Sequence, residues 1–314
     1  MKDIVLNKQN EKGMNRVIQY RFVYQDHCIM CGDNTQRHKF LGLRLNQSQG
    51  YHPQKKAGIR VSVYRCSKCG LIYANPLPIP VDLQDHYGVP PESYWKEEYF
   101  RTDPNYLGSV IKRLKEFDLT QDSKVLDIGA GLGKGMIAFN NAGFQAYGIE
   151  PSMPFYQRAV DVMGVDSNKI KCVSIEDAVF ENDFFDFISF GAVLEHLPDP
   201  SLAIQKAIKW LKPGGLMRIE VPSSNWLIPR IVNTIYKLKA IPYVTNISPM
   251  HEPYHLYEFS KDAFEFHAKC NKYHVIGVEY YICNSFMPKI FDPVLRPLMK
   301  HTNTGMEICV WIKK

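Results

Sequence analysis

A glycine-rich stretch directly after an apolar run constrains the fold of this chain more than any other feature. The apolar run lies at 125–128, and glycines follow at positions 129, 131, 133 and 135. Such a run predicts a buried strand over 124–129, and the glycines allow the backbone to turn sharply into a helix that continues to Ala142. The sequence therefore predicts a strand–turn–helix unit with bare backbone at the turn.

A turn of this kind suits a nucleotide, because exposed N–H groups and a helix N-terminus face the ligand and no Cβ atoms prevent close approach. A second short strand ends at Glu150, 17 positions after Gly133. A carboxylate at this place is the expected partner of ribose hydroxyls. The glycine spacing does not fit the dinucleotide pattern G-x-G-x-x-G, but together with Glu150 it indicates an adenosine-type cofactor.

Three further features follow in order: Asp127 before the glycines, the stretch 185–200 with the sequence FDFISFGAVLEHLPDP, and the stretch 210–222 with the sequence WLKPGGLMRIEVP. As a set they resemble the class I S-adenosylmethionine (SAM)-dependent methyltransferases over roughly residues 105–314. The resemblance implies SAM as cofactor and an α/β, Rossmann-like fold with a seven-stranded, mostly parallel sheet and an antiparallel edge strand. Two alternatives are an α/β domain with an empty glycine loop and a nicotinamide dehydrogenase, and the second is disfavoured because the Glu-His-Leu-Pro and Lys-Pro-Gly-Gly stretches have no role there.

The resemblance also implies which residues meet the cofactor. The methionine and ribose side is lined by Asp127, Gly129, Gly131 and Gly133; Glu150 binds the ribose hydroxyls; Ile175 and Glu176 meet the adenine; Gly191 and Ala192 flank the sulfonium. Asp127 alternatively braces the loop without touching the ligand.

A general base for the methyl acceptor needs a pKa near neutrality, which favours histidine and tyrosine. These residues are densest in the stretch 250–259, with the sequence MHEPYHLYEF. We predict His255 as the base and Tyr254 or His251 as hydrogen-bonding partners of the acceptor. His196 lies close to the expected sulfonium, although the Glu-His-Leu element also starts a helix in the family. A core or loop position for His255 is an equal alternative.

Four of the eight cysteines form two C-x-x-C-G motifs. These are Cys28 and Cys31, and Cys66 and Cys69. Each motif can place two thiolates on one tetrahedral ion, so the pair predicts a closed, structural zinc site. The 34 residues between Cys31 and Cys66 exceed the usual ribbon spacing. Four reduced thiols without metal, a redox dithiol, and replacement of one ligand by His27, His38 or His52 remain alternatives.

The segment after Cys69, including the proline-rich stretch 76–91, resembles a metal-binding leader found before some bacterial methyltransferases of sugars or sugar nucleotides. We therefore expect an N-terminal arm at 1–25, a small zinc-ribbon-like leader domain at 26–100 and a methyltransferase domain at 101–314. Within the last, we expect a lid or insertion at 223–260 and an edge-hairpin insertion at 283–304. The apolar pattern of 225–239 predicts a helix that packs on the protein's own core, forms a lid or contacts a membrane. We also expect the third strand of the sheet at 170–174, and Ser260 as the N-cap of a helix through Asn271.

The composition agrees with a globular enzyme. The 314 residues carry a net charge of +6 and a mean hydropathy of -0.25. Because the sequence shows no signal peptide and no apolar run of 18 residues, we expect a cytoplasmic protein. The resemblance of the leader implies a small-molecule acceptor, a sugar nucleotide or glycan precursor. DNA is not expected as a partner, and RNA and membrane contact are disfavoured. The alternatives are an RNA- or ribosome-modifying methyltransferase and a non-catalytic SAM-fold binding protein; the oligomeric state stays open.

Overall fold

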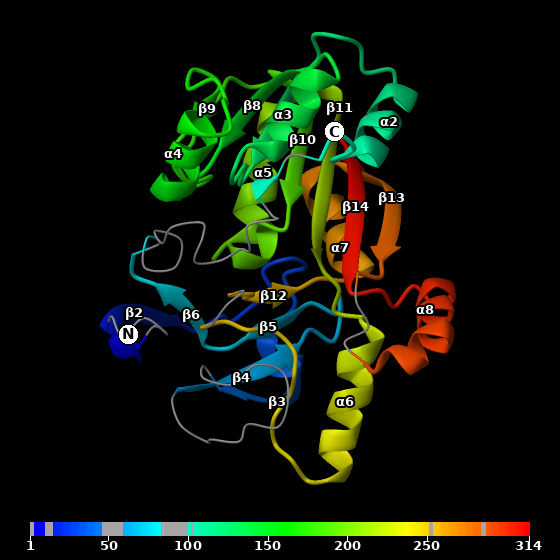
Figure 1. The fold of residues 1–314 in the computed structure, drawn as a ribbon. Helices are drawn as coiled ribbons and strands as arrows, with labels where there is room; N and C mark the ends of the chain where they lie inside the picture. The colour runs from blue at the N-terminus through cyan, green and yellow to red at the C-terminus, as the bar shows by residue number, and fades with distance from the viewer. Residues whose placement is uncertain are drawn as a thin grey trace.

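The computed structural model describes residues 3–9, 15–45, 59–82, 84, 100–101, 103–250, 254–283 and 287–314, with side chains described from residue 19 onward. In Figure 1 the chain forms two stacked parts. A large sheet flanked by helices makes the upper part, and smaller sheets with the long helix α6 (Leu227–Leu238) beside them make the lower part. The C-terminus lies at the top of this view and the N-terminus lies in the lower part.

A seven-stranded sheet in the order β13-β14-β11-β10-β7-β8-β9 forms the centre of the larger part. Its strands are β7 (Lys124–Ile128), β8 (Gln145–Ile149), β9 (Ile170–Lys171), β10 (Phe185–Gly191), β11 (Leu211–Pro222), β13 (His274–Tyr281) and β14 (Glu307–Lys313). The pairs from β9 to β11 are parallel, whereas β14 runs antiparallel to both β11 and β13 at one side of the sheet. This topology confirms the expected Rossmann-like fold class.

Apolar residues alternate between the two faces of the sheet. Val125, Phe187 and Trp311 belong to one hydrophobic cluster, whereas their neighbours Leu126 and Ile188 belong to the other. The first face is covered by α2 (Gly108–Glu116), α3 (Lys134–Asn141) and α4 (Met153–Asp161), and the second by α5 (Pro200–Trp210) and α7 (Lys261–Asn271). Consecutive strand residues point to opposite faces, so a strand covered on both sides must be apolar throughout.

Side chains cap the N-termini of two helices. Asp199 accepts a hydrogen bond from the backbone N–H of Leu202 at 2.8 Å and begins α5. Ser260 accepts one from Ala263 N–H at 3.1 Å and begins α7, as its position before an apolar pattern predicted. The third strand ends earlier than the expected 170–174, because its partner β8 ends at Ile149, opposite Lys171.

The first residues form a hairpin. Strand β1 (Asp3–Gln9) pairs antiparallel with β2 (Asn15–Val23), and β2 also pairs with β6 (Leu77–Pro80). The segment expected as an arm therefore enters a three-stranded sheet. The polar composition of this segment does not predict a strand. Strand β2 is held instead by pairing with the distant strand β6.

A four-stranded sheet carries the second cysteine motif and draws strands from distant parts of the chain. Strands β3 (Lys39–Leu45), β4 (Arg60–Arg65) and β5 (Ile72–Ala74) are joined by β12 (Tyr257–Glu258), which pairs antiparallel with β5. Its buried residues, together with those of α5 and α7, belong to one hydrophobic cluster. The cysteine-bearing sheet thus shares a core with the larger part of the molecule.

The segment predicted as a lid or insertion lies against this small sheet. The backbone N–H of Val244 donates to the carbonyl of Leu43 in β3 at 3.0 Å, and the N–H of Leu43 donates to the carbonyl of Pro242 at 2.8 Å. Helix α6 buries Ile228 and Tyr236 but leaves 82% of Leu238 exposed. The remaining helical elements are η1 (Thr35–Arg37), η4 (Leu194–His196), η5 (Lys289–Phe291) and α8 (Asp292–His301). No helix within the described ranges combines the length and apolar character needed to span a bilayer.

Candidate active site and cysteine cluster

The glycines after β7 have different structural roles. Gly129, Gly131 and Gly133 all adopt positive φ angles of 70°, 55° and 73°, which L side chains rarely adopt. A Cβ on Gly129 would lie 2.5 Å from Val193, and one on Gly133 would lie 2.4 Å from Val165. A Cβ on Gly131 would meet nothing closer than 3.9 Å. Packing therefore requires glycine at 129 and 133, whereas a Cβ at Gly131 would make only ordinary van der Waals contacts with the described residues.

Glu150 lies directly after β8 and holds this turn. Its Oε2 accepts a hydrogen bond from Gly131 N–H and its Oε1 accepts one from Ser152 N–H, both at 2.8 Å. The side chain is buried, and burial raises the pKa of Glu150 to about 7 against the opposing effect of these two hydrogen bonds. A carboxylate here can brace the glycine turn and still offer further lone pairs to ligand hydroxyls.

Asp127 lies in β7, two positions before Gly129. An added Cβ on Gly135, in the first turn of α3, would lie 2.3 Å from Asp127 Oδ2, so the carboxylate sits against the helix N-terminus. Burial raises the pKa of Asp127 to about 7, and the charge of Arg218 opposes this shift. In the sheet register, Ser189 lies between Asp127 and Arg218. This geometry fits the loop-bracing role as well as a ligand contact.

The other predicted cofactor residues lie at the ends of neighbouring strands. Gly191 and Ala192 are exposed after β10, and a Cβ on Gly191 would meet no described atom within 4 Å. Ile175 is buried in the core, whereas Glu176 is exposed and its carbonyl accepts from Lys206 Nζ at 2.7 Å. Gly131, Glu150 and Gly191 thus lie at the carboxyl ends of β7, β8 and β10, where ligands bind in sheets of this class, and the backbone at Gly191 is open among the described residues.

Two of the predicted catalytic histidines lie together around a carboxylate. The ring centroids of His196 and His255 are 5.1 Å apart, and the Nε2 atom of each lies 3.9 Å from Glu195 Oε1. Glu195 and His196 are neighbours in η4. The backbone N–H of Leu256, the residue after His255, donates to the carbonyl of Glu195 at 2.8 Å. This backbone contact joins the 254–256 segment to the end of β10.

Burial dominates the electrostatics of this group. It raises the pKa of Glu195 to about 8 and lowers the pKa of His196 to about 4. It also holds the pKa of His255 well below its usual value, and the neighbouring His196 adds to that effect. Without a bound ion, burial therefore favours neutral imidazoles at neutral pH, and it holds their pKa values below the near-neutral value expected of a general base.

The remaining predicted catalytic residues take different positions. Tyr254 is buried with a φ of 58°, and its carbonyl accepts from His196 Nδ1 at 3.3 Å. The structure thus gives its backbone a role toward His196. His251 lies outside the described residues.

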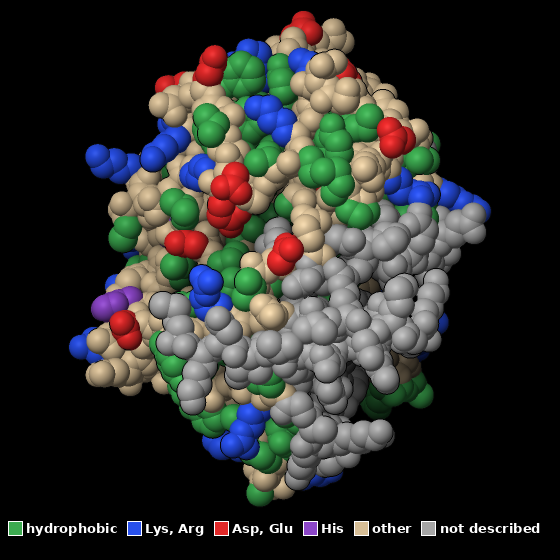
Figure 2. Space-filling view, turned by 90° about the vertical axis from the view of Figure 1, so that its left-hand side faces the viewer, with side chains coloured by type: hydrophobic (Ala, Val, Ile, Leu, Met, Phe, Trp, Pro, Cys, Tyr) green, Lys and Arg blue, Asp and Glu red, His purple; other side chains and the backbone are tan. Residues whose placement is uncertain are grey.

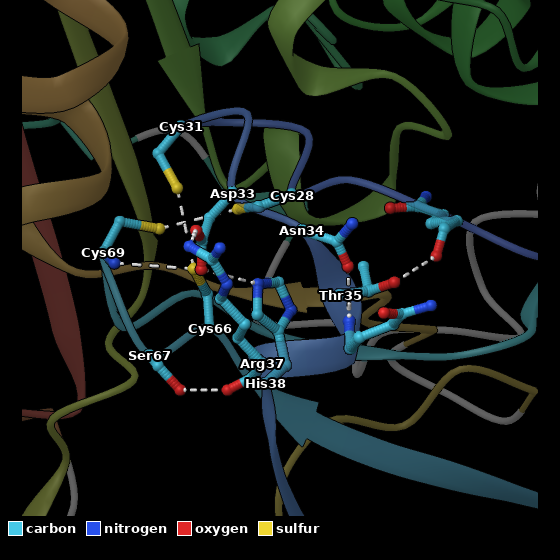
Figure 3. Close-up of polar contacts among 12 residues, drawn as sticks. Cys28, Cys31, Asp33, Asn34, Thr35, Arg37, His38, Cys66, Ser67 and Cys69 are labelled. Carbon is cyan, nitrogen blue, oxygen red and sulfur yellow. Dashed lines mark hydrogen bonds and ion pairs between the residues drawn. The ribbon is translucent and has the colours of Figure 1, made fainter.

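The four cysteines of the two motifs meet at one point (Figure 3). Sulfur atoms of Cys28 and Cys69 are 3.6 Å apart, and those of Cys31 and Cys66 are 3.5 Å apart. These distances are too long for a disulfide and close to the spacing of about 3.8 Å that four sulfurs take around a tetrahedral ion at 2.3 Å. The four thiols can therefore hold one metal ion.

Glycines shape both turns of the cluster, as the C-x-x-C-G pattern predicts. Gly32 and Gly70 have φ angles of 70° and 76°, and their N–H groups donate to the carbonyls of Cys28 and Cys66, both at 2.9 Å. Of the histidines that could replace a cysteine ligand, His38 is buried and its Nδ1 lies 2.6 Å from the Tyr73 hydroxyl. His38 lies beside the cluster, and the four cysteine sulfurs already complete a tetrahedral set of metal ligands.

Glu195 is the main residue that the sequence reasoning did not assign. The Glu-His pair was noted, but only His196 received a role. The flanking Leu194 and Leu197 were a usable signal, because a carboxylate between apolar residues at a strand end becomes buried when they pack. The charged pair of Arg218 and Glu220 on β11 was also missed; the two side chains are in direct contact.

Comparisons with known proteins agree with this architecture. A family model described as "Methyltransferase domain" matches residues 99–268, which is more than half of the chain. Ubiquinone biosynthesis O-methyltransferase of Bradyrhizobium sp. (strain ORS 278) is 29% identical over 139 residues, 43% of this chain and 54% of that protein. Phosphoethanolamine N-methyltransferase of Plasmodium falciparum is 33% identical over 135 residues, 39% of this chain and 51% of that protein.

Among solved structures, a SAM-dependent methyltransferase from Mesorhizobium loti aligns with a TM-score of 0.48 and 12% identity, covering 68% of this chain and 98% of that one. One from Archaeoglobus fulgidus aligns with a TM-score of 0.47 and 14% identity, covering 69% and 97%. The chain spans about half the length of the curated relatives it matches. On the extent of the family match, together with the sheet order and the glycine turn, the chain belongs to the methyltransferase domain family.

Proposed function

We propose that this protein transfers a methyl group from SAM to a small-molecule acceptor. The observation that carries the proposal is the contact of Glu150 with Gly131 N–H at 2.8 Å, together with the backbone at Gly191, where an added Cβ would meet no described atom within 4 Å. These groups supply what an adenosine-type ligand needs: a carboxylate for ribose hydroxyls and bare backbone for close approach. Family membership supports the choice of cofactor.

In the proposed mechanism, residues of this chain position the acceptor and remove its proton. SAM, when bound, supplies a methyl group that is already activated by its sulfonium, so no covalent nucleophile from the protein is needed. Glu150 and the turn around Gly131 fix the ribose side, with Asp127 against the helix. The group of Glu195, His196 and His255 would take the proton from the acceptor oxygen or carbon and so prepare it to receive the methyl group. His255 is the proposed base in the metal-free protein.

For the acceptor, we propose a sugar nucleotide or another glycan precursor, on the resemblance of the cysteine-bearing leader. The names of the two relatives refer to small molecules, ubiquinone and phosphoethanolamine. This supports a small acceptor in general. For the cysteine cluster we propose one structural zinc ion, because four thiolates leave no open coordination position.

The RNA-modifying alternative predicts an exposed basic face on the leader. Of the basic residues of the leader, His38 and Arg44 are buried whereas Arg37 and Lys39 are exposed, and the Arg44 Nε donates to the carbonyl of Ile247 at 2.9 Å. On the face of the molecule in Figure 2, Lys and Arg side chains are interspersed with Asp and Glu rather than gathered in one stripe. Both observations favour a small-molecule acceptor.

Isothermal titration of the purified protein with SAM and, separately, with NADH tests the proposal. We expect binding of SAM and no binding of NADH; absence of SAM binding would favour the non-catalytic alternative. Screening sugar nucleotides for methylation then tests the acceptor class. His255→Ala should lower turnover and leave SAM affinity unchanged, and unchanged turnover would remove His255 from the acceptor site.

A further inference from the structure

We propose that Glu195, His196 and His255 form a binding site for a divalent first-row transition-metal ion, separate from the cysteine cluster. One carboxylate and two imidazoles approach one another here, and one ligand atom from each residue lies within 4.8 Å of the others. The set of two histidines and one carboxylate is a known arrangement for such ions, and it leaves coordination positions open for other ligands.

The distances match those around an ion. Glu195 Oε1 lies 3.9 Å from Nε2 of His196 and 3.9 Å from Nε2 of His255, which is too long for a hydrogen bond. Two ligands bonded at about 2.0–2.2 Å to the same ion lie about 3 Å apart at right angles and about 4.4 Å apart when opposite. An ion can therefore join these atoms after small rotations of the side chains.

Glu195 supplies a second, independent observation. Its side chain is 1% exposed, and within the described part of the chain its Oε2 atom has no hydrogen-bond partner. A buried carboxylate oxygen without a partner is costly, and unsatisfied groups of this kind often mark a bound ion or water. The side chains of His196 and His255 are 19% and 25% exposed, so solvent and other ligands would reach an ion held by Glu195 from the side of the two imidazoles.

The surroundings also resemble those of a metal-bound histidine. His196 Nδ1 lies 3.3 Å from the Tyr254 carbonyl, which can only accept a hydrogen bond, so Nδ1 is the donor in this contact. Metal-bound histidines usually donate their other ring N–H to a carbonyl or carboxylate in this way. Backbone contact between Leu256 and Glu195 holds the two contributing segments together.

The site lies directly after Gly191 and Ala192, where the proposed function places the methyl donor. If that function holds, an acceptor hydroxyl at an open position of the ion would become more acidic and would lose its proton to water. This role depends on the proposed function, whereas binding of the ion does not. It also gives His255 the role of a ligand in the metal-loaded protein instead of that of the base.

Titration of the full-length protein with Co²⁺, followed by visible absorption and by metal analysis, tests the site. The protein is first freed of weakly bound metal while the cysteine cluster keeps its ion. We expect one further Co²⁺ per chain without the intense sulfur-to-cobalt absorption that cysteine ligands produce. Glu195→Gln and His255→Ala should each weaken this binding at least tenfold, and His301→Ala, at an exposed histidine on α8, should not change it.

Uptake of no Co²⁺ beyond the cysteine cluster would overturn the inference, as would unchanged binding in both Glu195→Gln and His255→Ala. Circular dichroism of each variant verifies its fold. Titration of the same samples with SAM separates the two proposals. SAM binding without a second ion would leave the proposed function standing and remove the metal site, whereas a second ion without SAM binding would do the reverse.

Discussion

The carboxylate of Glu150 accepts a hydrogen bond from the backbone N–H of Gly131, 19 positions earlier in the chain, at 2.8 Å. One acidic side chain at the end of β8 therefore fixes the glycine turn that follows β7. In the proposed cofactor site, the same carboxylate would also receive the ribose hydroxyls. Structural and ligand-binding roles thus meet in one residue, and the first two predictions separate them.

Glu150→Ala should weaken SAM binding by about 1–3 kcal/mol, the usual effect of losing hydrogen bonds to a charged group. It should also lower the thermal midpoint, because the N–H groups of Gly131 and Ser152 lose their acceptor. Glu150→Gln is the matched control, since it keeps one acceptor oxygen for the turn. Calorimetric affinities that are the same in the wild type and both variants would exclude Glu150 from the cofactor site.

SAM affinity should depend on pH around neutrality. Burial raises the pKa of Glu150 to about 7, so below that pH a proton competes with the ribose hydroxyls, and affinity should fall by at most about tenfold per pH unit. Stability has the opposite sign: because the folded-state pKa exceeds the ordinary 4.5, the free energy of unfolding falls as pH rises from 4.5 to about 7. Titrations and urea unfolding from pH 5 to 8 measure both effects. Glu150→Gln should reduce both slopes; slopes equal to those of the wild type would assign them to other groups such as Asp127.

Alanine at two glycines should separate folding from ligand binding. Gly133→Ala should destabilise the protein by about 2 kcal/mol or more, because of its positive φ and the close approach of Val165. Gly191→Ala meets no described atom within 4 Å, so its stability should stay within about 0.5 kcal/mol of the wild type while SAM binding weakens. Thermal unfolding and calorimetry measure the two properties. Full SAM affinity in Gly191→Ala would place the ligand elsewhere.

Loss of one cysteine ligand should affect the whole molecule. Cys69 is 1% exposed and belongs to the hydrophobic cluster that α5 and α7 share, so Cys69→Ser should abolish zinc binding and lower the thermal midpoint by on the order of 10 °C. Cys270→Ser, at an exposed cysteine outside the cluster, is the control and should change neither. Metal analysis with calorimetry provides the measurement. Retention of full zinc content in Cys69→Ser would argue against a four-cysteine site.

Glu258 links the small sheet to the segment before it. Its oxygens accept from Ile247 N–H at 2.8 Å and from Asn246 Nδ2 at 2.7 Å, and Arg44 supplies a favourable charge. Glu258→Ala should therefore reduce the free energy of unfolding by about 3–5 kcal/mol, because buried partners lose their counterpart. Glu116→Ala, which removes an exposed partner of Lys112, should cost less than about 0.5 kcal/mol. Urea unfolding measures both changes. Equal changes in the free energy of unfolding for the two variants would show that burial of Glu258 contributes nothing to stability.

The sequence by itself determined the features that contiguous residues encode. An apolar run followed by glycines predicted β7 and the turn to α3, Ser260 predicted the start of α7, and the C-x-x-C-G motifs predicted two tight turns with paired thiols. Each depends on backbone geometry and hydrogen bonds within a few residues, so the local pattern is sufficient. The order of the motifs then indicated the fold class through a known resemblance.

Only the tertiary structure decided which distant residues meet. Strand β12 joins the cysteine-bearing sheet from nearly 200 positions away, and His255 reaches Glu195 across 60 positions. It also separated Gly131, where an added Cβ would make only ordinary contacts with the described residues, from Gly129 and Gly133, where it would clash with Val193 and Val165. Burial and contact between remote segments depend on how the whole chain packs, and local periodicity does not encode them.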